Sequence, residues 1–191
     1  SNIDPTIHPD FDNRLFSGYD FVSNVAVSND GNGRDSDASD PGDWVSSCPG
    51  DPTKCQDSSW HGTVITSMLS APKSSSGSGV EMGPGIFAPI DGQPVVLPIR
   101  VGGTGGASSI DIIEAMYWAA GLSSVNGTPN NHPARVISLS YGATSDCQGG
   151  SGTVDALYRN AIAVLRSFGV VVVASAGNGN GSGLTGYATP S

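Results

Sequence analysis

One histidine in this 191-residue chain stands where a general base could be mounted. His61 opens a His-Gly-Thr triplet at the head of an apolar run, and imidazole titrates near neutral pH. The competing interpretation is an inert histidine that only begins a helix. Either way, the sequence predicts a helix that starts at His61 and carries four apolar residues, Val64, Ile65, Met68 and Leu69.

Apolar runs elsewhere in the chain predict the elements that must position such a residue. Three of them, at 94–101, 134–140 and 169–177, are rich in Val, Ile and Leu without alternation, which is typical of parallel strands covered on both faces. Helical patterns at 109–122 and 153–169 separate these runs. The first helix is expected to end at Gly121 and the second at Gly169.

The apolar residues of these two helices predict their buried faces. In the first helix the predicted face holds Ile110, Ile113, Met116 and Tyr117. In the second helix it holds Val154, Leu157, Ile162, Leu165 and Phe168.

Strands and helices that alternate along the chain predict an α/β fold, a doubly wound and mostly parallel sheet with helices on both faces. Residues 1–191 are expected to form part of one domain, with a polar acidic loop at 23–57 and a strand and helix core at 61–177.

Ligands of open α/β sheets gather at the carboxyl ends of the strands, so the segments that follow each predicted strand are candidate binding residues. Glycine-lined segments can pair with an extended peptide backbone, and an isolated Asn amide can donate to a developing oxyanion. These candidates are Gly105, Gly106, Ala107, Ser140, Tyr141, Gly142, Ser175, Ala176, Gly177 and Asn178. A dinucleotide-binding turn after Val101 is a remote alternative, because Ser109 and Asp111 stand where that turn needs glycines.

Four blocks of sequence carry a resemblance to a known family. They are "HPDF" at 8–11, "HGTVITSMLSA" at 61–71, "VISLSYGA" at 136–143 and "VVVASAGN" at 171–178. In this order and at this spacing they resemble the subtilisin-like serine peptidases, over essentially the whole chain. The resemblance implies that the protein is a secreted serine endopeptidase with a polypeptide substrate.

The resemblance also implies a role for each candidate. His61 would be the general base of a Ser-His-Asp triad, and Asn178 would be the side-chain donor of the oxyanion hole. Residues 105–107 and 140–142 would flank the substrate main chain, and residues 175–177 would form a wall of the primary specificity pocket.

The nucleophile of the triad is missing from these 191 residues, and the preferred position of the triad aspartate also lies outside them. No Gly-Thr-Ser-Met motif supplies a nucleophile, and Ser67 is rejected because it lies nearly two turns along the same predicted helix as His61. The triad aspartate is expected immediately before Ser1, with Asp4 as the alternative. We therefore expect an incomplete catalytic domain that is inactive alone and needs the rest of the domain as its partner. A non-catalytic peptide-binding or scaffold relative remains the alternative.

Acidic residues gather in the segment 29–43, at Asp30, Asp35, Asp37, Asp40 and Asp43. Carboxylates on a turn-rich loop suit Ca²⁺, and subtilisin-like enzymes are often stabilised by calcium. A structural calcium site at Asp35, Asp37, Asp40 and Asp43 is therefore predicted, with a solvated acidic loop as the alternative.

Three cysteines are an odd number. Cys48 and Cys55 flank a short turn-rich loop and are expected to form a disulfide, with the partner of Cys147 outside these residues. A zinc site of these two cysteines and His61 is disfavoured, because the cysteine spacing is wide and no fourth ligand is apparent.

Charge and composition exclude several classes of partner. The net charge is −9, so nucleic acid and anionic membranes would be repelled. No apolar run reaches the roughly 18 residues of a membrane span, and residues 1–20 do not resemble a signal peptide.

With 27 Gly, 13 Pro and only 13% charged residues, the composition is typical of a loop-rich extracellular protein. The sequence does not indicate an oligomeric state.

Overall fold

A computed structural model describes residues 14–46, 48, 50–51, 55–70, 85–86, 94, 96–144, 153–175 and 188–189. The chain divides into two compact units, Ser1–Asp111 and Ile112–Ser191, and each is described by itself. Among the described residues, no helix has the length and apolar character needed to cross a membrane.

The first unit is organised around a parallel pair of short strands. β1 (Tyr19–Asp20) runs beside β2 (Ile99–Arg100), with Tyr19 opposite Ile99, and a bridge between Leu15 and Val96 continues the pairing. Parallel neighbours require a long crossover connection, and here the intervening chain includes α1 (Val25–Ser28) and α2 (His61–Ser70). The predicted helix does start at His61.

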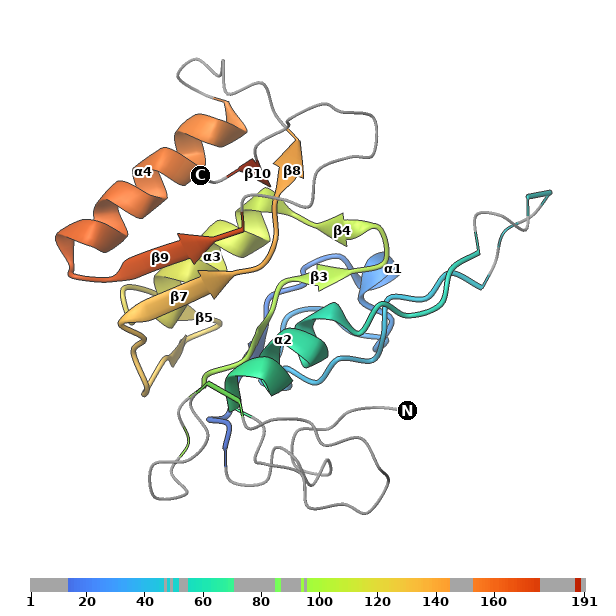
Figure 1. Ribbon diagram of the computed structural model, residues 1–191, viewed down its shortest axis with the longest axis horizontal. Coiled ribbons are helices and arrows are strands. Elements are labelled where there is room, and N and C mark those ends of the chain that lie inside the picture. Colours follow the sequence, from blue (N-terminus) through green and yellow to red (C-terminus); the bar gives the residue numbers. More distant parts are fainter. Residues whose placement is uncertain are drawn as a thin grey trace. The chain divides into compact units, whose positions relative to one another are not determined.

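The second unit contains a strand–helix–strand repeat. β7 (Val136–Leu139) pairs in parallel with β9 (Val171–Ala174), and α4 (Val154–Ser167) connects them and lies along β9 (Figure 1). α4 begins because the Thr153 side chain accepts a 3.3 Å hydrogen bond from the backbone N–H of Ala156. It ends at the predicted Gly169, which has a φ of +77°.

α3 (Ser109–Ala119) crosses the boundary between the two units. Its end is fixed by Gly121, with a φ of +73°, and by a 2.9 Å hydrogen bond from the Leu122 N–H to the Tyr117 carbonyl. The predicted stop is therefore confirmed. Helices that connect parallel strands establish the α/β class of the fold.

Three antiparallel pairs complete the secondary structure of the described residues. They are β3 (Gly102–Gly103) with β4 (Gly106–Ala107), β5 (Ser124–Val125) with β6 (Thr128–Pro129), and β8 (Ala143–Thr144) with β10 (Ala188–Thr189).

Burial corrects two details of the sequence interpretation. The buried residues of α3 include Ile112, Ala115, Met116 and Ala119, whereas Ile110 is exposed. Apolar residues surround α3, so several faces fitted the pattern, and packing selected a stripe with the i, i+3, i+4, i+7 spacing. In α4 the buried residues are Tyr158, Ala161 and Leu165, whereas Val154, Leu157 and Phe168 are exposed.

The strands are also shorter and more exposed than predicted. Val136, Val171 and Val173 are each more than half exposed, and more buried residues alternate with them along β7 and β9. Among the described residues, one face of the β7 and β9 pair is therefore more buried than the other.

Candidate active site

His61 is the first residue of α2, and its side chain is exposed. The carbonyl of Trp60 accepts the first helical hydrogen bond, 2.9 Å from the backbone nitrogen of Val64. Trp60 has a φ of +51°, a left-handed conformation that is rare for a large side chain, and it turns the incoming chain sharply into the helix. The histidine is therefore presented at a helix end that immediately follows a tight turn.

Ser67, the serine that the sequence analysis rejected as the nucleophile, forms a hydrogen bond within its own helix. Its hydroxyl donates a 2.7 Å hydrogen bond to the Val64 carbonyl.

The glycine segment proposed for substrate binding forms a tight hairpin in the first unit. β3 and β4 pair through Gly102 with Ala107 and Gly103 with Gly106, and Thr104 and Gly105 make the turn. The hairpin is held to α1, because the Thr104 N–H donates a 2.8 Å hydrogen bond to the Val27 carbonyl. A Cβ atom on Gly103 would lie 2.0 Å from the same carbonyl oxygen, so this approach requires glycine.

A cavity of about 210 Å³ lies beside this hairpin. Its walls are α1, the hairpin and the start of α3, formed by Val22, Asn24, Val27, Val101, Thr104, Gly105, Gly106, Ala107, Ser108 and Asp111. The Asp111 carboxylate accepts hydrogen bonds from the Ser23 N–H (3.1 Å) and hydroxyl (2.9 Å), and it forms an ion pair with Arg34. The buried charge of Asp111 is thus compensated within this unit.

The other substrate-binding candidates belong to the second unit. Residues 140–142 follow β7 directly, and Ser175 follows β9. The Ser175 N–H donates a 3.2 Å hydrogen bond to the Leu139 carbonyl, so the two segments start at the same edge of the parallel pair. Ala176, Gly177 and Asn178 lie outside the described residues, as do Cys147, Asp4 and Ser1, and their predicted roles stay predictions.

The carboxylates of the acidic segment accept hydrogen bonds from separate neighbouring groups of the protein and do not surround one common point. Asp35 accepts from the N–H of Asp37 (2.7 Å), and Asp37 accepts from the N–H of Ser39 (2.9 Å). Asp40 bonds to Gly42 and Thr63, and Asp43 bonds to Ser59. Within the described part of the chain, no three His, Cys, Asp or Glu side chains are arranged to hold a metal ion. Calcium binding at Asp35, Asp37, Asp40 and Asp43 stays a prediction.

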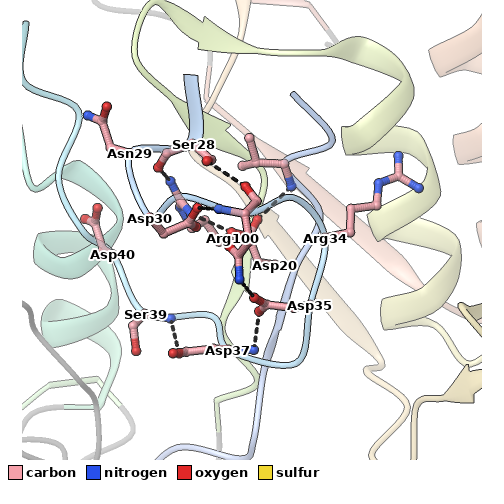
Figure 2. A network of polar contacts seen from close by, with 12 residues as sticks. Asp20, Ser28, Asn29, Asp30, Arg34, Asp35, Asp37, Ser39, Asp40 and Arg100 are labelled. Atoms are coloured by element: carbon pink, nitrogen blue, oxygen red, sulfur yellow. Dashed lines mark hydrogen bonds and ion pairs between the residues drawn. The ribbon is translucent and has the colours of Figure 1, made fainter. Parts of the chain in front are cut away.

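A buried charge network that the sequence analysis missed shares Asp30 with this segment (Figure 2). The Arg100 guanidinium, at the end of β2, pairs with the carboxylates of Asp20 and Asp30 and also bonds to the Ser28 carbonyl. Asp20 is fully buried, and its other oxygen accepts a 2.7 Å hydrogen bond from the Val22 N–H. The sequence signal that could have revealed this network is a charged residue at the end of each of two otherwise apolar strand segments.

The two carboxyls of this network have opposite pKa shifts. Burial raises the pKa of Asp20 to about 7, against the opposing effects of the Val22 N–H and Arg100. Partial burial also acts to raise the pKa of Asp30. Hydrogen bonds from Ser28 and Asn32 and the charge of Arg100 outweigh that effect, so the pKa of Asp30 is lowered.

The predicted disulfide is present between Cys48 and Cys55, whose Cα atoms are 5.6 Å apart. It lies within the segment between Asp43 and Ser59, and a bridge between Val45 and Gln56 joins the two arms of that segment just outside the disulfide.

Comparison with known proteins now assigns the family. The sequence profile of the Subtilase family matches residues 1–191. The chain therefore belongs to the Subtilase family, and the predicted resemblance is confirmed.

Two curated relatives and one solved structure agree with this assignment. The chain is 38% identical over 176 residues to an "Extracellular protease" of Xanthomonas campestris pv. campestris. It is 32% identical over 179 residues to an "Extracellular basic protease" of Dichelobacter nodosus. Each match covers 91% of this chain and 27% of the relative, so the chain spans about a quarter of these relatives. A solved structure of a protease from Pseudoalteromonas arctica matches with a TM-score of 0.70 and 40% identity, over 90% of this chain and 46% of that one.

Proposed function

We propose that the protein containing these residues is a secreted serine endopeptidase in which His61 is the general base. The observation that carries the proposal is an exposed histidine at the first position of α2, in a chain that matches the Subtilase family from end to end. The names of the relatives, both extracellular proteases, support secretion and a polypeptide substrate.

The proposed chemistry is acyl transfer through a Ser-His-Asp triad. A serine hydroxyl is a weak nucleophile at neutral pH, so His61 would accept its proton during attack on the peptide carbonyl and return it to the leaving amine. The serine would be supplied by chain beyond residue 191 and the aspartate by chain before Ser1. Asn178 would donate its side-chain amide to the oxyanion of the tetrahedral intermediate.

The substrate main chain would bind by strand addition. The hairpin residues Gly105, Gly106 and Ala107 are proposed to pair with the substrate backbone, and so are the residues after β7. Small residues at these positions support the proposal, because they leave backbone N–H and C=O groups accessible to an extended peptide.

A serine-directed fluorophosphonate tests this function in the full-length encoded protein. The wild type is expected to be labelled at one serine, and His61→Ala is expected to slow the labelling by roughly 10³-fold or more. A non-catalytic, peptide-binding relative would show no labelling of the wild type. Labelling of His61→Ala at the wild-type rate would contradict the role of His61 as base.

A further inference from the structure

The N-terminal end of α2 is not capped by the residue at the N-cap position. Trp60 occupies that position, because its carbonyl accepts the hydrogen bond from Val64, but an indole ring has no acceptor oxygen. The first N–H groups of a helix need partners. One of them, the His61 N–H, donates to the Ser59 hydroxyl, and two carboxylates that are distant in the sequence hold Ser59 and the Thr63 side chain.

Asp43 holds the residue that serves as the cap. Its Oδ1 accepts a 2.6 Å hydrogen bond from the Ser59 N–H, and its Oδ2 accepts a 2.8 Å bond from the Ser59 hydroxyl. The Ser59 Oγ in turn accepts a 3.4 Å hydrogen bond from the backbone N–H of His61. The backbone of His61 is therefore tied, through Ser59, to a carboxylate 16 residues before Ser59.

Asp40 holds the same helix turn from a second direction. Its Oδ2 accepts a 3.2 Å hydrogen bond from the Thr63 hydroxyl, and Figure 2 shows Asp40 beside α2. Its Oδ1 accepts a 2.9 Å bond from the Gly42 N–H, which fixes the carboxylate. His61 therefore lies between two anchored residues, Ser59 and Thr63.

The turn that carries both carboxylates is itself constrained. Gly42 has a φ of +100°, and a Cβ atom there would lie 2.3 Å from the Ser58 hydroxyl and 2.8 Å from the Trp44 ring. The Gly42 carbonyl accepts a 2.9 Å hydrogen bond from the Asn29 side chain. Glycine thus allows residues 40–43 to approach the start of α2 closely.

We propose that Asp43 and Asp40 are positioning residues that fix the first turn of α2 and so set the place of the His61 imidazole. Carboxylates near a helix N-terminus are also favoured by the helix dipole, which adds to the hydrogen bonds. A displacement of about 1 Å in a catalytic group can cost about 10²-fold in rate, so a small loosening of this turn is expected to be costly. The inference rests on the proposed function, since position matters for catalysis only if His61 is the base.

The test measures kcat and KM of the full-length protein on a chromogenic peptide, with active sites counted by the fluorophosphonate. Asp43→Ala and Ser59→Ala are expected to lower kcat per active site by about 10-fold or more, while KM stays within about two-fold. Ser59→Thr keeps the hydroxyl and the N–H and is expected to retain most of kcat. Asp57→Ala removes an equal charge from the same loop; Asp57 is exposed and has no hydrogen bond to α2, so its kcat is expected to match the wild type.

The control variants separate failure of this inference from failure of the proposed function. If Asp43→Ala and Ser59→Ala match Asp57→Ala in kcat per active site, while His61→Ala is inactive, the positioning role is wrong and the function stands. A loss confined to the number of titratable sites would make the contact purely structural and would also overturn the inference. If the wild type shows neither labelling nor hydrolysis, the proposed function itself fails.

Discussion

Two groups of carboxylates, at opposite ends of the segment 20–43, are used in different ways. Asp20 and Asp30 surround the Arg100 guanidinium at the end of β2, and Asp20 is fully buried. Asp40 and Asp43 lie in partly exposed positions and bond to hydroxyl and N–H groups at the start of α2. The first group joins a loop to the strand pair, whereas the second joins a loop to the candidate base.

The two groups differ in how much stability is lost when a carboxylate loses its partner. A buried ion pair that loses one partner leaves an uncompensated charge in a low-dielectric environment. An exposed carboxylate that loses its partner is solvated by water, so little stability is lost. We therefore expect the interior group to govern stability and the surface group to govern rate.

Removal of the central cation has the largest expected effect on stability. At about pH 8, above the raised pKa of Asp20, Arg100→Met would leave the buried carboxylate of Asp20 without its counterion and is expected to destabilise the fold by about 3–5 kcal/mol. Urea unfolding, followed by tryptophan fluorescence, measures this change. The double variant Asp20→Asn/Arg100→Met is the control and should recover part of the loss; an equally unstable double variant would show that the charge is not the cause.

The raised pKa of Asp20 predicts a pH dependence of stability. Its folded pKa, about 7, exceeds the ordinary value of 3.8 for an aspartate, so the folded state binds more protons between these values. The contribution of Asp20 is fully present below about pH 4 and is lost as the pH rises through 7, with a slope of at most about 1.4 kcal/mol per pH unit. Asp30, whose pKa is lowered, acts in the opposite direction and loses its contribution as the pH falls.

Unfolding of the wild type and of Asp20→Asn, measured between pH 4.5 and 7.5, isolates this contribution. The wild type should lose stability relative to Asp20→Asn as the pH rises. Parallel pH profiles would show that the pKa of Asp20 is not raised by folding.

Removal of the disulfide is expected to have a moderate effect on stability and little effect on rate. The bond between Cys48 and Cys55 closes a short loop, for which chain entropy predicts about 2.5 kcal/mol. The hydrogen bonds between Asp43 and Ser59 lie outside the loop that this disulfide closes, so they can persist without it. Comparison of Cys48→Ser/Cys55→Ser with Asp43→Ala in unfolding and in kcat separates the two effects. A larger fall in kcat for the cysteine variant would assign the positioning role to the disulfide.

The smallest expected effect concerns calcium. Asp35 and Asp37 already accept hydrogen bonds from neighbouring N–H groups. We therefore expect any change that Ca²⁺ makes in the melting temperature to be the same in the wild type and in Asp37→Ala. Thermal unfolding with and without Ca²⁺ measures the difference. A calcium-dependent rise that is lost in Asp37→Ala would instead support the calcium site predicted from the sequence.

Local signals predicted the helix ends and the disulfide well. The start of α2 at His61, the stops at Gly121 and Gly169, and the disulfide of Cys48 with Cys55 follow from neighbouring residues alone. The family also followed from short blocks of sequence, which the profile match confirms.

Contacts between distant residues were not predictable in the same way. Asp20 and Arg100 are 80 residues apart, and Asp43 is 16 residues from Ser59. In the sequence Asp43 looks like a metal ligand, because the sequence shows the carboxylate and not the donors that reach it. The buried faces of α3 and α4 were predicted only in part, with Met116 and Leu165 confirmed, since tertiary packing selects among several apolar stripes.

The central claim, that His61 acts as general base in a peptidase, is tested most directly by peptide hydrolysis in the full-length protein. We predict that His61→Ala lowers kcat by roughly 10³-fold or more, with unfolding and KM close to those of the wild type. A His61→Ala enzyme that retains kcat within about ten-fold of the wild type would contradict the account.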